Sequence, residues 1–233
     1  MEIVVIIIIV VIICIQIKKE KDYKKTTYYQ VTQNSYSKTI NSKGENGEYK
    51  IYTYLNEYEN YGAKFLFNCY IPQQNNKTTE IDVIMIHPTG IFVFESKNYK
   101  GWIFGNEKNV NWTQTLSMGK GRPVQKNSFY NPIKQNQQHV HALRKIIGNE
   151  IPIFSIIVFS DDCTFKNVTI TESSACVIQL RQLKGTIRAI IGCNSEYPDT
   201  YNVNEIYNKL YSYTQVSEEI KQQHIIDIRN KYK

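Results

Sequence analysis

Four residues of this 233-residue chain have the types and the order of a hydrolytic metal site. Glu48 is followed by Asp82, and twelve residues separate Asp82 from Glu95-Ser96-Lys97. Mg²⁺ prefers carboxylate oxygens, and a bound divalent cation can activate water and neutralise charge on a phosphodiester. We therefore predict that Asp82, Glu95 and the backbone carbonyl of Ser96 bind Mg²⁺ or Mn²⁺. Lys97 is predicted to orient the attacking water or stabilise developing charge, and Glu48 to act as a further ligand or outer-shell acid.

A β-hairpin is predicted to carry most of these residues. Two apolar stretches, 80–87 and 91–97, have the composition of strands. With Thr89-Gly90 as a two-residue turn, Asp82 would lie opposite Lys97, and Glu95 would be its diagonal neighbour. Each residue alone has a simpler explanation, such as a solvated strand edge or compensation of a helix dipole. Carboxylates in buried strands are costly without a partner or a metal, which favours a functional role.

Basic residues follow the hairpin in the sequence. Lys120, Arg122 and Lys126 lie in a region, 117–130, that lacks periodicity and is predicted as a flexible loop. Together with Lys134 they are predicted to bind nucleic acid along its phosphates; a merely solvated loop is the alternative. Other predicted strands cover 63–71, 102–104, 110–116, 151–159 and 176–178. Helices are predicted over 44–56, 131–147, 179–191 and 202–233.

The chain resembles the nuclease-related domain (NERD) family, a branch of the PD-(D/E)xK nuclease superfamily, over about residues 41–145. The residues that carry the resemblance are Gly44-x-x-Gly47-Glu48, Glu80-Ile81-Asp82, Gly90-Ile91-Phe92-Val93-Phe94-Glu95-Ser96-Lys97-Asn98, Gly101-Trp102-Ile103-Phe104-Gly105, Trp112, and Asn131-Pro132-x-x-Gln135 with His139. The resemblance implies an α/β, restriction-endonuclease-like core with a mixed central β-sheet flanked by helices. It also implies the catalytic roles above for Glu48, Asp82, Glu95 and Lys97, and adds Gln135. Ile81 stands where the superfamily's name places a proline.

The N-terminus is strongly apolar. Residues 3–13 are all Ile or Val, and five lysines follow between Lys18 and Lys25. This pattern predicts a transmembrane anchor over 1–17, although a helix over 3–17 spans only about 22 Å against a hydrocarbon core of about 30 Å. A cleaved signal peptide and a buried strand are the alternatives. The positive-inside rule then predicts a single-pass cell-membrane protein with its C-terminal domain in the cytoplasm.

The remaining composition bounds the function without choosing it. An excess of 28 Lys and Arg over 21 Asp and Glu gives a net charge of +7, which suits nucleic acid or an anionic lipid surface. Five scattered cysteines without a C-x-x-C pair favour reduced thiols over a zinc site or a disulfide framework. We expect His139 and His141 at the helix surface and lower core, and Trp102 and Trp112 in hairpin packing.

These observations predict a membrane-anchored, metal-dependent nuclease-like protein that processes DNA. Its predicted parts are an anchor (1–17), a polar juxtamembrane linker (18–40), a nuclease-like domain (41–195) and a C-terminal helical extension (196–233). A catalytically inactive nucleic-acid-binding module and a membrane-associated interaction module are the alternatives.

Overall fold

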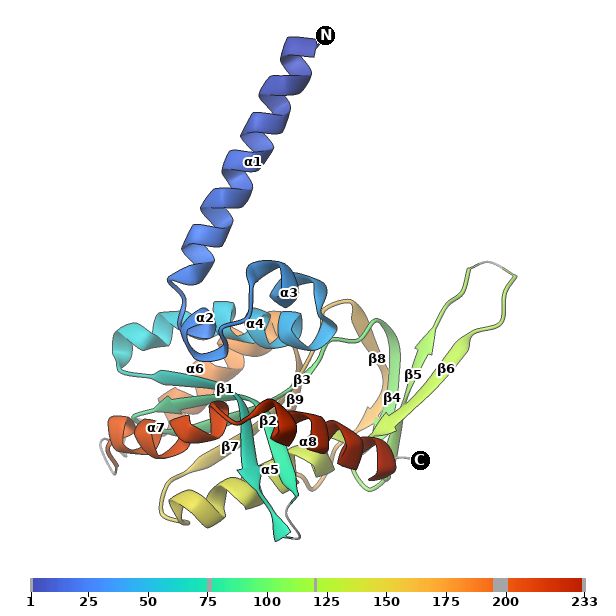
Figure 1. The fold of residues 1–233 in the computed structure, drawn as a ribbon. Helices are drawn as coiled ribbons and strands as arrows, with labels where there is room; N and C mark the ends of the chain where they lie inside the picture. Colours follow the sequence, from blue (N-terminus) through green and yellow to red (C-terminus); the bar gives the residue numbers. More distant parts are fainter. Residues whose placement is uncertain (1, 75–76, 120, 195–200, 232–233) are drawn as a thin grey trace.

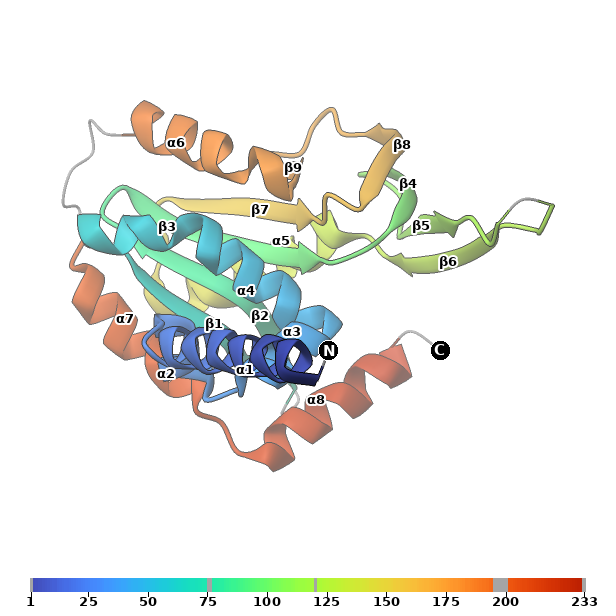
Figure 2. The same cartoon turned by 90° about the horizontal axis from the view of Figure 1, so that it is seen from above.

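The computed structural model describes residues 2–74, 77–119, 121–194 and 201–231. They form a mixed α/β fold with two sheets, and helices flank the larger one (Figures 1 and 2). Sheet A has the order β1-β2-β3-β7-β9, and sheet B has the order β6-β5-β4-β8. The strands are β1 Lys64–Pro72, β2 Thr78–His87, β3 Gly90–Lys97, β4 Gly101–Asn106, β5 Asn111–Leu116, β6 Gln125–Tyr130, β7 Ile153–Phe159, β8 Cys163–Thr169 and β9 Cys176–Gln179.

The helices are α1 Glu2–Lys24, α2 Thr27–Thr32, α3 Tyr36–Asn41, α4 Lys43–Leu55, α5 Pro132–Ile147, α6 Leu183–Cys193, α7 Val203–Tyr211 and α8 Glu218–Lys231. Short 3₁₀ helices cover η1 Asn56–Tyr61, η3 Leu180–Gln182 and η4 Ser212–Thr214. Within sheet A, β1, β2 and β3 are antiparallel, whereas β3, β7 and β9 are parallel. The expected mixed sheet flanked by helices is therefore present.

Each face of sheet A has its own hydrophobic core. One face packs against α2, α4 and α6, where Tyr28 and Leu55 are fully buried. The other packs against α5 and α7, where Leu143 and Leu210 are fully buried. Figure 1 shows these two groups of helices on opposite sides of the sheet. A third cluster, around Trp112, joins the two sheets. Trp112 is buried there as expected, whereas Trp102, also expected in hairpin packing, is 44% exposed.

The alternation of side chains reverses at one point in β1 and β2. Val83 belongs to the core beneath α4, whereas Ile81, two residues earlier, belongs to the core beneath α5. Residues two apart in a regular strand share a face, so the alternation must change at Asp82. In β1 the change falls at Asn68, whose φ of 52° is left-handed. Asp82 therefore lies where the strand pair is irregular.

Four parts of the fold differ from the sequence predictions. Strand β8, Cys163–Thr169, was not predicted. Residues 125–130, expected to be loop, form β6 and pair with β5. The helix predicted over 202–233 is divided into α7 and α8 by η4. Residues 18–40, expected to be a polar linker, continue α1 and then form α2 and α3, and their Tyr23 and Tyr28 are buried.

The predicted membrane anchor is wrong. In the ranges that the structure describes, none of the helices has both the length and the apolar character that crossing a membrane requires. The exposed apolar part of α1 ends at Ile17, and the same helix continues directly into Lys18, Lys19 and Glu20. The single-pass membrane location and the membrane partner predicted from residues 3–17 are withdrawn with it.

Candidate active site

The β2–β3 hairpin places the predicted acidic residues, but in a different register from the one expected. His87 pairs with Gly90, so the two-residue turn is Pro88-Thr89. Pro at the second position and Gly at the fourth are typical of a type I turn. A side chain at Gly90 would also lie 2.9 Å from the Pro152 carbonyl oxygen. The pairing that was predicted between Asp82 and Lys97 is therefore shifted by two residues.

Asp82 lies just beyond the paired part of the hairpin, whose last pair is Val83 and Phe94. The backbone N–H of Ser96 donates a 2.8 Å hydrogen bond to Asp82 Oδ2. Burial, followed by the charges of Glu95 and Glu48, raises the pKa of Asp82 well above its ordinary value. The pKa of Asp82 thus depends on carboxylates on both faces of the sheet.

Glu95 and Lys97 form a buried ion pair. Their side chains are only 2% and 13% exposed, and Lys97 Nζ lies 2.6 Å from Glu95 Oε1. Burial alone would raise the pKa of Glu95, but Lys97 and His139 outweigh it and hold that pKa below its ordinary value. Burial would likewise lower the pKa of Lys97, yet Glu95 raises it. Glu95 is therefore an anion and Lys97 a cation.

Helix α5 covers this pair with two side chains. Gln135 Oε1 accepts a 3.1 Å hydrogen bond from Lys97 Nζ. His139 Nε2 lies 3.0 Å from Glu95 Oε2, and its Nδ1 lies 2.7 Å from Thr79 Oγ1. We expected His139 in the helix surface and lower core; it is buried and contacts the acidic site directly. Its position one helical turn after Gln135 was the available signal.

The start of α5 is held in place by Asn131. Its Oδ1 accepts a hydrogen bond from Ile133 N at 2.9 Å, which caps the helix at the residue where the sequence predicted it to begin. Its Nδ2 donates to the carbonyls of Glu107 and Asn109 in the β4–β5 turn, at 2.9 and 2.8 Å. Sheet B thereby fixes the helix that carries Gln135.

Glu48 approaches from the other side of the sheet. It lies in α4, is 6% exposed, and accepts a 3.1 Å hydrogen bond from the Tyr28 hydroxyl. Burial, with the charge of Glu80 second, raises the pKa of Glu48 to about 8. Tyr28 comes from the segment that was expected to be linker, so sequence reasoning missed it.

Glu80 is a further acid near Glu48, and the sequence analysis did not assign it to the site. The Tyr70 hydroxyl donates to its Oε1 at 2.6 Å, and His224 Nε2 of α8 lies 3.6 Å from its Oε2. Glu48 and Glu80 both line a cavity of about 300 Å³ between the N-terminal helices and α8. Glu80 stands beside Asp82 in the sequence motif, which was the available signal.

The donor chemistry of this cluster fits a hard divalent cation. Asp82, Glu95 and Glu48 offer oxygen ligands, and a cation would relieve the repulsion and burial that raise two of their pKa values. Within the described ranges, however, no three His, Cys, Asp or Glu residues are grouped closely enough to hold a metal ion. Both Glu95 oxygens already contact Lys97 and His139.

The predicted nucleic-acid-binding residues are dispersed. Lys126 is exposed on β6, and Arg122 is exposed in the connection between β5 and β6, which projects from the body of the molecule (Figures 1 and 2). Lys134 lies on α5, next to Gln135. Lys120 falls outside the described residues. Of the three that the structure describes, only Lys134 lies on an element that contributes to the acidic site.

Comparisons with known proteins agree with the geometry. The model of the nuclease-related domain (NERD) family matches residues 43–160, which include the acidic cluster, Lys97 and Gln135. An uncharacterized protein of Bacillus anthracis is 30% identical over 194 residues, which cover 82% of this chain and 85% of that protein. No solved structure matches the chain. The chain belongs to the nuclease-related domain family.

Proposed function

We propose that this chain is a metal-dependent nuclease with a restriction-endonuclease-like core that hydrolyses phosphodiester bonds of DNA. The observation that carries the proposal is the buried Glu95–Lys97 pair beside Asp82. An isolated buried ion pair adds little stability, because desolvation offsets its attraction. A second acid beside the pair, Asp82, raises the cost further, as the raised pKa of Asp82 indicates. Perturbed titrating groups gathered in this way are typical of catalytic sites.

In the proposed reaction, water forms a new bond to phosphorus while one ester P–O bond breaks. One proton of the water ends on the leaving oxygen, and its hydroxyl remains on the phosphate. Asp82, Glu95 and the Ser96 carbonyl would hold Mg²⁺ or Mn²⁺. A metal held there would provide a water of lowered pKa and would neutralise charge on the phosphate oxygens.

Side chains of the protein would carry out the other roles in the reaction. Lys97 is held by Glu95 and Gln135, so its ammonium group is fixed where it can orient the water or stabilise negative charge. His139 holds the other oxygen of Glu95 and thereby sets the orientation of that carboxylate. Glu48, whose pKa is about 8, carries a proton at neutral pH and is a candidate outer-shell acid.

The test is cleavage of labelled single- and double-stranded DNA, and of RNA, by the full chain with EDTA, Mg²⁺ or Mn²⁺. Asp82→Asn and Lys97→Ala should each abolish metal-dependent cleavage. Lys108→Ala is the matched control, because Lys108 is 66% exposed, lies in the β4–β5 turn, and carries the same charge. If the protein cleaves RNA alone, the proposed hydrolysis of phosphodiester bonds is retained, and RNA replaces DNA as its substrate.

The catalytic assignment fails if the wild-type protein cleaves none of these substrates. It also fails if both site variants cleave as fast as Lys108→Ala. DNA binding that persists unchanged in Asp82→Asn without any cleavage would instead identify an inactive nucleic-acid-binding module.

A further inference from the structure

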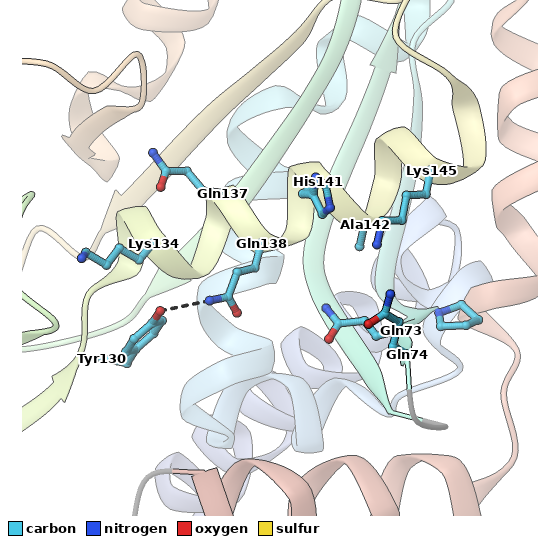
Figure 3. A pocket seen from close by; sticks show the side chains of 10 residues that line it. Gln73, Gln74, Tyr130, Lys134, Gln137, Gln138, His141, Ala142 and Lys145 are labelled. Carbon is cyan, nitrogen blue, oxygen red and sulfur yellow. Dashed lines mark hydrogen bonds between the residues drawn. The ribbon is translucent and has the colours of Figure 1, made fainter.

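A polar groove runs along the outer face of α5 (Figure 3). Its volume is about 750 Å³. One wall is α5, from Lys134 to Lys145; the other includes Gln73 and Gln74, which follow β1, and Tyr130 ends β6 at the N-terminal end of the helix. The Tyr130 hydroxyl accepts a 3.0 Å hydrogen bond from Gln138 Nε2 across this end.

The lining has the chemistry of a phosphate-binding surface. Lys134 and Lys145 bring positive charge to its two ends, and glutamine amides lie between them. None of the described residues that line the groove is Asp or Glu. Lysine, glutamine and tyrosine side chains are the groups that contact nucleic-acid backbones. This surface contrasts with the acidic cluster on the inner side of the same helix.

The groove and the acidic cluster share α5. Gln135 and His139 point inward to Lys97 and Glu95, whereas Lys134 and Gln138, each one residue earlier, line the groove. Adjacent helical residues are separated by about 100° around the axis. A chain that occupies the groove would therefore contact the same helix whose inner face holds Gln135 and His139 against the Lys97–Glu95 pair.

We propose that this groove binds the sugar-phosphate backbone of one nucleic-acid strand and aligns it with the acidic cluster. The proposal rests on the proposed nuclease function for the identity of the bound polymer. Lys134 and Lys145 are separated along the axis by about 16 Å, at 1.5 Å per residue. At a rise of about 3.4 Å per nucleotide, the groove spans roughly five nucleotides of a strand. Direct contacts to the bases are not required.

The test measures binding of a labelled DNA strand to the full chain in EDTA, so that no cleavage occurs, across a series of salt concentrations. The variant is Lys134→Ala with Lys145→Ala. Its matched control is Lys184→Ala with Lys209→Ala, which removes the same charge from exposed positions on α6 and α7. An uncharged peptide nucleic acid of the same sequence serves as the probe without phosphates.

We expect the groove variant to bind the strand several-fold more weakly than wild type. Loss of two phosphate contacts should reduce the slope of log affinity against log salt by about 1.4. The control should bind as wild type does, and the peptide nucleic acid should not bind. Equal loss in both double variants, or wild-type affinity in the groove variant, overturns the proposal.

Failure of the groove and failure of the nuclease give different results. If the groove variant binds DNA as tightly as wild type and the wild type shows metal-dependent cleavage, the groove proposal is refuted and the nuclease proposal is retained. If the groove variant binds DNA more weakly but the wild type shows no cleavage in Mg²⁺ or Mn²⁺, the catalytic assignment is refuted and the groove proposal is retained.

Discussion

Replacement of Glu48 by Gln should change the pH dependence of folding stability. The pKa of Glu48 is raised from 4.5 to about 8 by burial and by the charge of Glu80. Between these values the unfolded chain loses the proton while the folded chain keeps it. Stability from this group is complete below about pH 4.5 and is lost as the pH rises through about 8. The amide in the variant does not titrate, so the variant should lack this part of the pH dependence.

The magnitude follows from the shift. Each pKa unit corresponds to about 1.4 kcal/mol, so the wild type loses up to roughly 5 kcal/mol of unfolding free energy across this window through Glu48. The amide oxygen of Gln can still accept the hydrogen bond from Tyr28. We therefore expect Glu48→Gln to match the wild type near pH 4.5 and to exceed its stability by several kcal/mol near pH 8.

The assay is urea unfolding in EDTA at intervals from pH 4.5 to pH 9, followed by circular dichroism. Titrating groups that do not interact with Glu48 are common to both proteins and cancel in the difference between them. Asp82 and Glu80 interact with Glu48, so their response to its loss is part of the difference. Glu150→Gln, at an exposed position, is the matched control for the loss of one carboxylate. A pH-independent difference between wild type and Glu48→Gln would refute the view that the fold holds this carboxyl protonated.

Two further substitutions test how the site is supported. Gly47→Ala should lower stability and cleavage, because its new Cβ would lie 2.3 Å from Ser96 Oγ; adding Ser96→Ala should restore part of the loss, as thermal unfolding and rates with Mg²⁺ can show. Asn131→Ala should lower the unfolding free energy by at least about 1 kcal/mol, because it removes a helix cap as well as bonds to Glu107 and Asn109. Urea titration measures this loss, and Asn204→Ala, at an exposed position in α7, is the control. An equally small loss of unfolding free energy in both variants would contradict the prediction.

Local signals in the sequence predicted much of the fold. Helix α5 begins and ends as expected, because Asn131-Pro132 and Gly148 are strong start and stop signals. The central hairpin was also expected, because its apolar residues are continuous. The order of Glu48, Asp82, Glu95 and Lys97 indicated a nuclease-like site, and Gln135, which the resemblance added to it, accepts a hydrogen bond from Lys97.

The register of the hairpin was predicted incorrectly because two overlapping turns were possible around Pro88-Thr89-Gly90. Gly90 suggested that the turn included it, whereas its contact with the Pro152 backbone is what requires a glycine there. The reversal at Asn68 was also hidden, since alternation assumes regular strands. The pattern of polar and apolar residues around Asn68 did not indicate that its backbone would be left-handed inside a strand.

Residues 18–40 were misread for a different reason. Tyrosine counts as polar in a search for amphipathic helices, yet Tyr23 and Tyr28 are almost fully buried and their rings contact those of Tyr49 and other tyrosines. β6 was missed because none of its residues is buried, which leaves no alternation of buried and exposed side chains to detect. The proximity of His224 to Glu80 joins distant parts of the chain, so neither residue alone could predict it.

The irregular point at Asn68 and Asp82 lets two independently packed halves of the protein contribute to one site. Glu48 depends on the tyrosine-rich core under α4, whereas Glu95 and Lys97 depend on α5 and its anchor to sheet B. Mutations in one half can therefore accumulate without disturbing the packing of the other. Asp82 and Glu80 are where their effects meet, because each of these carboxylates interacts with both Glu48 and Glu95, and selection on the two halves is coupled through them.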